Sequence, residues 1–198
     1  MRLDPHQEEA VAWLLTHPRG GLADEMRVGK TAPTVVAAAR AGARRVLVLC
    51  PAIARAVWRE AVRDWYVGDA EWRILSYDQY ASQDHARRED IVAWQPDTLI
   101  LDECHYLKSI KAKRTFCLYG RRAAGTPLLE EARRVWLLSG PPCPNGPHEL
   151  WTHFAAVFND GLSYHDWLRR YCIFEWTEYG PKVTGVRDIA LPELRAKF

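Results

Sequence analysis

Short apolar runs that alternate with helical segments constrain the fold of this chain more than any other feature. The runs have the length and composition of buried strands, and they lie at 44–50, 72–77, 97–103 and 133–140. Between the first two runs, apolar residues recur at helical spacing. These residues are Ile53, Val57, Ala61 and Trp65. Strands separated by helices pair in parallel and are covered on both faces. The sequence therefore predicts an α/β domain, with a mostly parallel sheet flanked by helices on both faces.

Further helix and strand signals extend this pattern toward both ends of the chain. An Asp-Pro pair at 4–5 is a good helix cap and first turn, and it predicts a helix that ends near residue 16. A short strand is expected after the Gly-Gly pair at 20–21, followed by a helix over 30–40. Residues 175–190 predict an irregular or hairpin-like excursion.

Composition limits the environment in which the chain works. The chain has 198 residues, of which 48% are hydrophobic, and its net charge is +2. It contains no apolar run long enough to cross a membrane, and we expect no secretory signal at its start. The five cysteines are scattered and none forms a C-x-x-C pair, so neither a disulfide framework nor a zinc knuckle is indicated. These features favour a cytoplasmic protein with no membrane partner.

The stretch GLADEMRVGKTAP at 21–33 contains Gly29-Lys30-Thr31, the ending of a phosphate-binding loop. A helix that starts here presents free backbone N–H groups and a positive dipole end to phosphate. Lys30 would reach the β- and γ-phosphates of a nucleotide, and the Thr31 hydroxyl would ligate Mg²⁺. The tripeptide also occurs by chance, so its position at a helix start carries the prediction.

A second motif, TLILDECH at 98–105, places two acids at the end of an apolar strand. We assign Asp102 to the Mg²⁺ shell and Glu103 to the attacking water. Because both motifs follow strands in the expected order, together they predict phosphoanhydride chemistry, with Lys30, Asp102 and Glu103 as catalytic residues. His105 has two interpretations: it couples this motif to Ser139-Gly140 on a neighbouring strand end, or it caps the next short helix.

The segment HELWTH at 148–153 is similar to a zinc-protease helix, but its spacing is wrong. His148 and His153 are five residues apart instead of four, which separates them by roughly 140° around a helix. We therefore expect no zinc site.

Five segments of the chain carry a family resemblance, in the same order as in the family. They are LDPHQEEAVAWL at 3–14, GLADEMRVGKT at 21–31, and the segments 46–65, 98–114 and 135–151. They resemble the Q-motif and motifs I, Ia, II (the DExH box) and III of a superfamily 2 translocase of the Snf2 type. The chain is similar to the first RecA-like lobe of this family, in the bacterial and phage branch related to annealing helicases.

The resemblance implies a RecA-like P-loop lobe over 1–158, with 159–198 as an extension that leads toward a second lobe. It implies ATP and Mg²⁺ as cofactors, and Gln7 would read the adenine. The implied nucleotide contacts are Gln7, Asp24, Glu25, Met26, Arg27, Gly29, Lys30 and Thr31.

Two positions depart from the family pattern. Arg27 stands where the family usually has glycine; it either tolerates about 1 kcal/mol of backbone strain or contacts phosphate itself. Pro141 stands where the family usually has threonine, which would weaken coupling between the nucleotide site and DNA.

The resemblance also implies duplex DNA as a partner, held mainly through its phosphates. The residues expected to contact DNA are Arg55, Lys108, Lys111, Lys113 and Arg114. The alternative for the group 108–114 is a solvated helix face. Trp58 and Trp65 lie at helical spacing and are expected in the core rather than stacked on bases.

Snf2-type motors close two lobes around ATP, and the second lobe supplies arginine fingers. No second set of strands and helices follows 139–140, so we expect a truncated half-motor that binds Mg-ATP and turns it over poorly. One alternative is a natural stand-alone module that binds DNA or a partner without ATP turnover. A third hypothesis, another P-loop enzyme such as a nucleotide kinase, lacks an evident lid or acceptor pocket.

Overall fold

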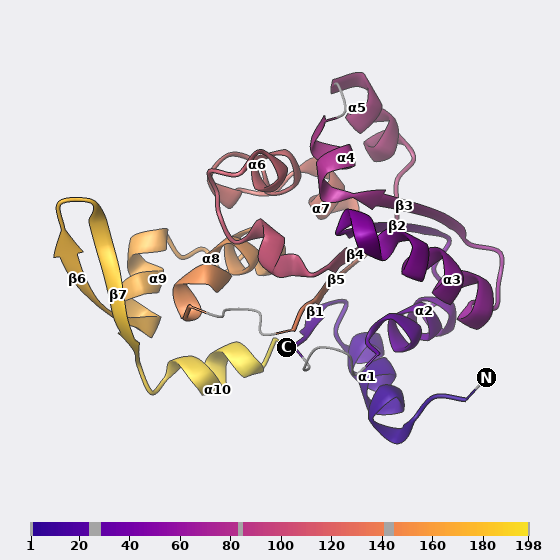
Figure 1. Cartoon of the computed structure of the whole chain (residues 1–198), viewed down its shortest axis with the longest axis horizontal. Helices are drawn as coiled ribbons and strands as arrows, with labels where there is room; N and C mark the ends of the chain where they lie inside the picture. The colour runs from indigo at the N-terminus through magenta and orange to yellow at the C-terminus, as the bar shows by residue number, and fades with distance from the viewer. Residues whose placement is uncertain (1, 24–28, 83–84, 141–144, 198) are drawn as a thin grey trace.

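A computed structural model describes residues 2–23, 29–82, 85–140 and 145–197 of the chain. Its centre is a five-stranded sheet in the order β1-β5-β4-β2-β3, and all neighbouring strands run parallel. The strands are β1 (Arg19–Leu22), β2 (Arg45–Cys50), β3 (Glu71–Ser76), β4 (Thr98–Asp102) and β5 (Arg134–Leu138). The α/β prediction is confirmed, and the sheet has the parallel, helix-flanked form of a RecA-like domain (Figure 1).

The central strands are apolar along their buried middle parts because both of their faces are covered. In β2, Leu47 and Leu49 point into one core cluster, whereas Val46, Val48 and Cys50 point into another. Successive side chains of a strand face opposite sides of the sheet, so one apolar run serves two cores.

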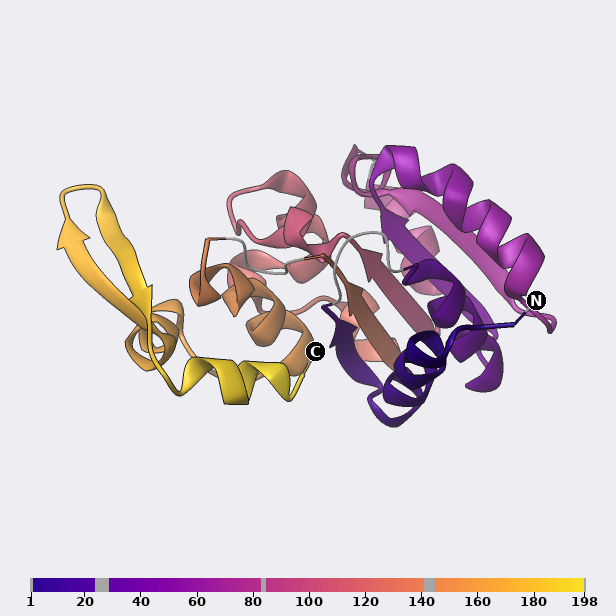
Figure 2. The same ribbon diagram turned by 60° about the horizontal axis from the view of Figure 1, so that its bottom comes forward.

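Two groups of helices cover the two faces (Figures 1 and 2). One group is α1 (Pro5–Thr16), α2 (Thr31–Arg40) and α3 (Arg55–Trp65). The other is α4 (Tyr77–Ser82), α5 (His85–Ala93), α6 (Lys113–Tyr119) and α7 (Pro127–Glu131). The helices predicted from the Asp-Pro pair and from the phosphate-loop motif are therefore confirmed as α1 and α2.

The buried face of α3 differs from the predicted one. Ile53 is 90% exposed and Val57 is 54% exposed, so these two positions of the predicted stripe are wrong. Ile53 lies in the 3-10 turn η1 (Ala52–Ala54), before α3 begins. Trp58 is fully buried, and Ala61, Val62 and Trp65 pack around the same core. The real stripe therefore starts at the large indole of Trp58 and follows helical spacing from there. The expectation that Trp58 and Trp65 belong to the core is confirmed.

Short helical turns follow both β4 and β5. Between these strands lie η2 (Cys104–Leu107) and η3 (Arg121–Ala123). After β5 come η4 (Pro147–Leu150), α8 (Trp151–His153) and the π-helical η5 (Phe154–Phe158), which lead to the C-terminal part of the chain. After them come α9 (Tyr164–Tyr171), β6 (Cys172–Thr177), β7 (Gly180–Val186) and α10 (Ala190–Arg195). Strands β6 and β7 form an antiparallel hairpin, which confirms the hairpin-like excursion and extends it back to residue 172.

The C-terminal elements have a core of their own. Trp167 and Leu168 of α9 are fully buried against Trp151 and Phe154, and α10 completes this cluster. The hairpin projects away from the sheet, as both views show (Figures 1 and 2). After α10 the chain returns to the edge of the sheet, where Gly21 N donates a hydrogen bond to Lys197 O at 2.8 Å. In the described part of the chain, no helix combines the length and apolar character that a membrane crossing requires.

Candidate functional site

The carboxyl ends of three neighbouring strands bring the sequence motifs together. Leu22 at the end of β1 and Asp102 at the end of β4 both pair in register with Leu138 at the end of β5. Eight residues separate the end of β1 from the start of α2. Ligands of parallel α/β sheets bind at this edge. The phosphate-loop motif, the acidic motif and Ser139 therefore share one edge of the sheet.

The end of the phosphate-loop motif has the geometry of a tight turn into a helix. Gly29 has φ +77°, a conformation that favours glycine, and Lys30 occupies the N-cap of α2, with Thr31 as its first residue. The Lys30 carbonyl accepts hydrogen bonds from the Thr34 N–H at 3.3 Å and the Thr34 hydroxyl at 2.7 Å. Lys30 and Thr31 thus stand at the start of a helix, the end to which its positive dipole points.

The preceding loop positions lie outside the described residues. These are Asp24, Glu25, Met26 and Arg27. Their contacts with a nucleotide, and both interpretations of Arg27, stay predictions.

Gln7 of α1 is held at both ends of its side-chain amide. Its Oε1 accepts a hydrogen bond from Asp4 N at 3.1 Å, and its Nε2 donates one to Gly29 O at 3.3 Å. Gln7 therefore ties the start of α1 to the loop before α2. Its role in reading adenine stays a prediction.

Asp102 is a mostly buried carboxylate with donors on both oxygens. Trp58 Nε1 donates to Oδ2 at 2.8 Å, and Glu103 N donates to Oδ1 at 3.0 Å. The Tyr77 hydroxyl donates to the Asp102 backbone carbonyl at 2.8 Å. Burial raises the pKa of Asp102, while the Trp58 hydrogen bond and the charge of Lys30 act in the opposite direction. Asp102 is thus held in place and lies within electrostatic reach of Lys30.

Glu103 turns the chain from β4 into η2. Its φ of 49° and ψ of 53° are left-handed, a conformation that costs a non-glycine residue on the order of 1 kcal/mol. Its Oε2 is buried and receives no well-aligned hydrogen bond from the described residues, although His105 Nδ1 lies 3.2 Å away. Strain and an unsatisfied carboxylate oxygen therefore meet at the residue expected to orient water.

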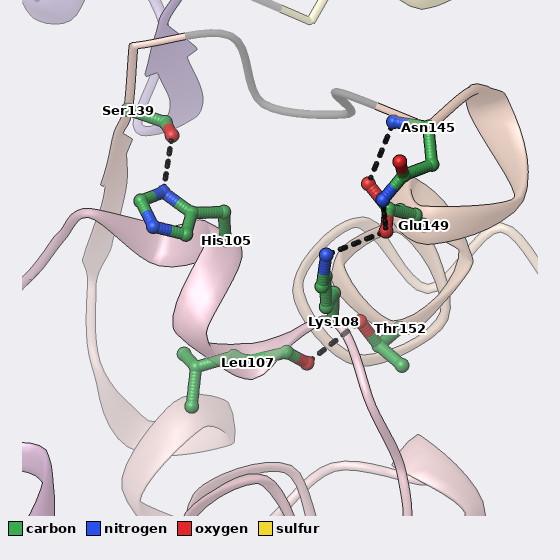
Figure 3. A network of polar contacts seen from close by, with 7 residues as sticks. All are labelled: His105, Leu107, Lys108, Ser139, Asn145, Glu149 and Thr152. Carbon is green, nitrogen blue, oxygen red and sulfur yellow. Dashed lines mark hydrogen bonds and ion pairs between the residues drawn. The ribbon is translucent and has the colours of Figure 1, made fainter.

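His105 contacts the end of β5, as one of its two interpretations predicts. Its Nδ1 lies 3.2 Å from the Ser139 hydroxyl, and Ser139 is fully buried (Figure 3). Gly140 is buried beside it. The acidic motif and the serine motif are therefore in direct contact. Pro141, the departure that follows them, lies outside the described residues.

A second bridge between the same segments was missed by the sequence reasoning. Lys108 Nζ lies 2.6 Å from Glu149 Oε1, and Asn145 Nδ2 donates to that oxygen at 2.8 Å (Figure 3). Thr152 Oγ1 donates to Leu107 O at 3.0 Å. Burial raises the pKa of Glu149, but the hydrogen bonds from Lys108 and Asn145 outweigh it and lower the pKa overall. The sequence offered one signal for this ion pair: Glu149 is a charged residue among apolar ones, and a buried acid needs a cation.

The residues expected to contact DNA differ in their surroundings. Arg55 begins α3, and its Nε is buried without a hydrogen-bond partner among the described residues. Lys111 and Lys113 are exposed. Lys108 is paired with Glu149, and Arg114 Nε donates to Tyr106 O at 2.7 Å. The contacts of these five residues with DNA stay predictions, as does the alternative of a solvated face.

Two cavities lie outside the edge formed by the motifs. One of about 650 Å³ opens at the amino ends of the strands, where Arg45, Glu71 and Asp97 line it. Another of about 440 Å³ lies beside Lys108 and Lys111. The first is on the wrong edge of a parallel sheet for a nucleotide.

The two histidines of HELWTH have different surroundings. His153 is fully buried, its Nδ1 lies 2.7 Å from the Tyr119 hydroxyl, and burial lowers its pKa to about 3. His148 lies in η4, before α8 begins. Within residues 2–23, 29–82, 85–140 and 145–197, no three His, Cys, Asp or Glu side chains group as metal ligands. A magnesium site needs fewer protein ligands, because Mg²⁺ keeps several waters.

The fold and this edge define an α/β domain of the RecA-like class, and sequence comparisons are consistent with that class. No protein-family model matches the chain. The SWI/SNF-related matrix-associated actin-dependent regulator of chromatin subfamily A-like protein 1 of Xenopus tropicalis is 30% identical, over 94% of this chain and 21% of the relative. The protein of that name from Drosophila melanogaster is 28% identical, over 95% of this chain and 26% of the relative.

A differently named relative matches the same part of the chain. The DNA annealing helicase and endonuclease ZRANB3 of Homo sapiens is 24% identical, over 86% of this chain and 17% of the relative. The chain thus spans 17% to 26% of the length of these curated relatives. Its similarity to SWI/SNF-related proteins agrees with the Snf2-type resemblance of its motifs.

Proposed function

We propose that this chain is the ATP-binding lobe of an Snf2-type, DNA-dependent ATPase that moves on duplex DNA. The observation that carries the proposal is the shared edge of the sheet: Lys30 stands at the start of α2, which follows β1, and Asp102 stands at the end of β4, in register with the end of β1 through β5. A cation at a helix start and an acid at a strand end on the same edge of the sheet are two parts that a P-loop ATPase requires. The names of the relatives, which include a DNA annealing helicase, support DNA as the substrate.

The described residues fit Mg-ATP. The N–H groups at the start of α2 and the Lys30 ammonium would hold the β- and γ-phosphates. The Thr31 hydroxyl and the Asp102 carboxylate offer oxygen ligands, which Mg²⁺ prefers. Mg²⁺ held by these oxygens would supply positive charge to neutralise the phosphates. The Glu103 carboxylate would orient the attacking water.

Turnover requires more than this edge of the sheet in our proposal. The transition-state charge of phosphoryl transfer is commonly stabilised by arginine fingers, worth 10³ to 10⁵ in rate. We propose that a second RecA-like lobe supplies them, and that the chain alone turns ATP over slowly. The assignment of 1–158 to the lobe and of 159–198 to an extension is part of this proposal, as is the bacterial and phage branch.

The test is nucleotide binding and steady-state ATP hydrolysis, with and without duplex DNA, by the wild-type chain and by Lys30→Ala. We expect Mg-ATP binding that the substitution abolishes, with little turnover in either protein. DNA-stimulated turnover that disappears in Lys30→Ala would contradict the half-motor proposal and indicate a complete catalytic unit. DNA binding without nucleotide binding would instead support a stand-alone DNA-binding module.

A further inference from the structure

The Asp102 carboxylate is held by a side chain from a distant part of the chain. Trp58, on α3, donates from its indole Nε1 to Asp102 Oδ2 at 2.8 Å. Trp58 has no exposed surface, and it lies on the stripe of α3 that packs against the sheet. The indole therefore cannot turn away from the carboxylate without disturbing the core.

The two donors to Asp102 leave it able to bind a cation. Trp58 occupies one site on Oδ2, and the Glu103 N–H occupies one site on Oδ1. Each carboxylate oxygen has about two acceptor sites, so each keeps one. The final torsion of an aspartate is broad and is not set by staggered wells. The two hydrogen bonds therefore set the plane of the carboxylate and the direction of its remaining lone pairs.

We propose that Trp58 is a positioning residue for magnesium: its indole N–H orients the Asp102 carboxylate toward the metal that accompanies the nucleotide. This inference rests on the proposed function and identifies the residue of α3 that supports its metal site. Hydrogen bonds that orient a metal ligand typically matter by 10-fold to 100-fold in metal affinity. Trp58 does not touch the metal or the nucleotide in this arrangement and acts through Asp102.

A purely structural role for Trp58 predicts a different result, and Trp136 provides the matched control. Trp136 is also fully buried, in the same core cluster, and its indole Nε1 donates to His17 O at 3.2 Å. Its acceptor, His17, lies in the segment between α1 and β1, so Trp136 does not contact Asp102 through its indole N–H. Trp136→Phe thus removes an equally buried indole without removing a donor to Asp102.

The experiment measures the affinity of the whole chain for ADP by calorimetry, in excess Mg²⁺ and in EDTA. We expect Trp58→Phe to weaken ADP binding in Mg²⁺ by about 10-fold or more, and to change binding in EDTA by less than about twofold. Trp136→Phe should leave the ratio of the two affinities at its wild-type value. The inference would be overturned if Trp58→Phe kept the wild-type ratio of ADP affinities in Mg²⁺ and in EDTA, or if both variants lost the same affinity in Mg²⁺. Either result would leave the proposed function standing. A wild-type chain that binds no ADP would overturn the proposed function together with the inference.

A second measurement covers the case in which Trp58→Phe does not fold. In the ¹⁵N-labelled wild-type chain, the indole N–H signal of Trp58 should move when Mg²⁺ is added to the ADP complex, and the signal of Trp136 should not. A Trp58 signal that stays in place while the signal of Gly29 moves would overturn the inference.

Discussion

Lys108 and Glu149 form an ion pair, with 2.6 Å between Nζ and Oε1, that joins the segment after β4 to the 3-10 helix after β5. The lysine side chain is 37% exposed, whereas the glutamate side chain is 8% exposed. A lysine expected to bind DNA therefore also neutralises a buried acid. Substitution of Lys108 would change stability as well as DNA affinity, and the two effects must be measured separately.

Lys108→Ala should destabilise the chain by about 1–3 kcal/mol, because Glu149 loses its cation while remaining buried. Urea unfolding at pH 7 measures this loss. Lys111→Ala removes an exposed lysine from the same segment and should change stability by less than about 0.5 kcal/mol. Equal stability of the two variants would show that the ion pair contributes nothing.

The difference between wild type and Lys108→Ala should depend on pH. The pKa of Glu149 is lowered in the folded chain, so the stabilisation is fully present above the unfolded pKa, at about 4.3. It should disappear as the pH falls through the lower, folded value. Urea unfolding of both proteins at pH 7, 4 and 3 should show the gap closing, and a constant gap would contradict this account.

His153 should make the chain sensitive to mild acid. Its pKa is lowered to about 3 by burial, with a smaller contribution from the charge of His105, whereas an unfolded histidine has a pKa near 6.5. Between these two pKa values, the unfolded chain therefore binds a proton at this histidine and the folded chain does not. The wild type should lose about 1.4 kcal/mol per pH unit from this residue between about pH 6 and 4.

His153→Gln removes the titrating group and keeps a polar side chain that can hydrogen-bond the Tyr119 hydroxyl in either direction. Its stability should fall less steeply than that of the wild type over the same pH range. Parallel stability curves for wild type and His153→Gln would contradict the buried, neutral histidine.

Arg55→Ala should weaken binding to duplex DNA and reduce its salt dependence. Each lost phosphate contact lowers the slope of log K against log salt by about 0.9. Fluorescence anisotropy from about 50 to 200 mM salt measures this slope. Arg63→Ala removes the same charge from the same helix, where Arg63 pairs with Asp64 and Glu60. If the salt dependence falls by the same amount in both variants, Arg55 contributes only net charge and makes no phosphate contact.

Gly29→Ala should cost more than the backbone strain of its turn. Gly29 has φ +77°, and an added Cβ would lie 2.9 Å from Gln7 Nε2. Gly42 has φ +64° and open space around the same position, so Gly42→Ala should cost only the strain of about 1 kcal/mol. Urea unfolding measures the loss of stability in each variant, and the extra loss in Gly29→Ala is the cost of displacing Gln7. This extra loss should vanish when Gln7→Ala is added. If it persists, the added Cβ clashes with another group.

Much of the fold could be read from the sequence because local rules decide it. The apolar runs that became β2, β4 and β5 have the length and composition of strands buried on both faces, and their alternation with helices predicted parallel pairing. Parallel strands end on one edge, so Lys30, Asp102 and Ser139 were expected near one another. The physical reason is that hydrophobic periodicity and chain order are themselves properties of the sequence.

Only the tertiary structure determined which side chains contact one another. Helical spacing alone allowed a stripe through Ile53 and Val57, but the burial of the large indole of Trp58 set the rotation of α3. That rotation places Trp58 against Asp102, 44 residues away in the chain. Long-range packing likewise places Lys108 against Glu149, where the two form an ion pair. Such contacts depend on how whole elements fit together, and no local pattern encodes them. The sequence by itself determined which residues could do chemistry and where along the chain they stand; only the packed structure determined which side chains hold them in place.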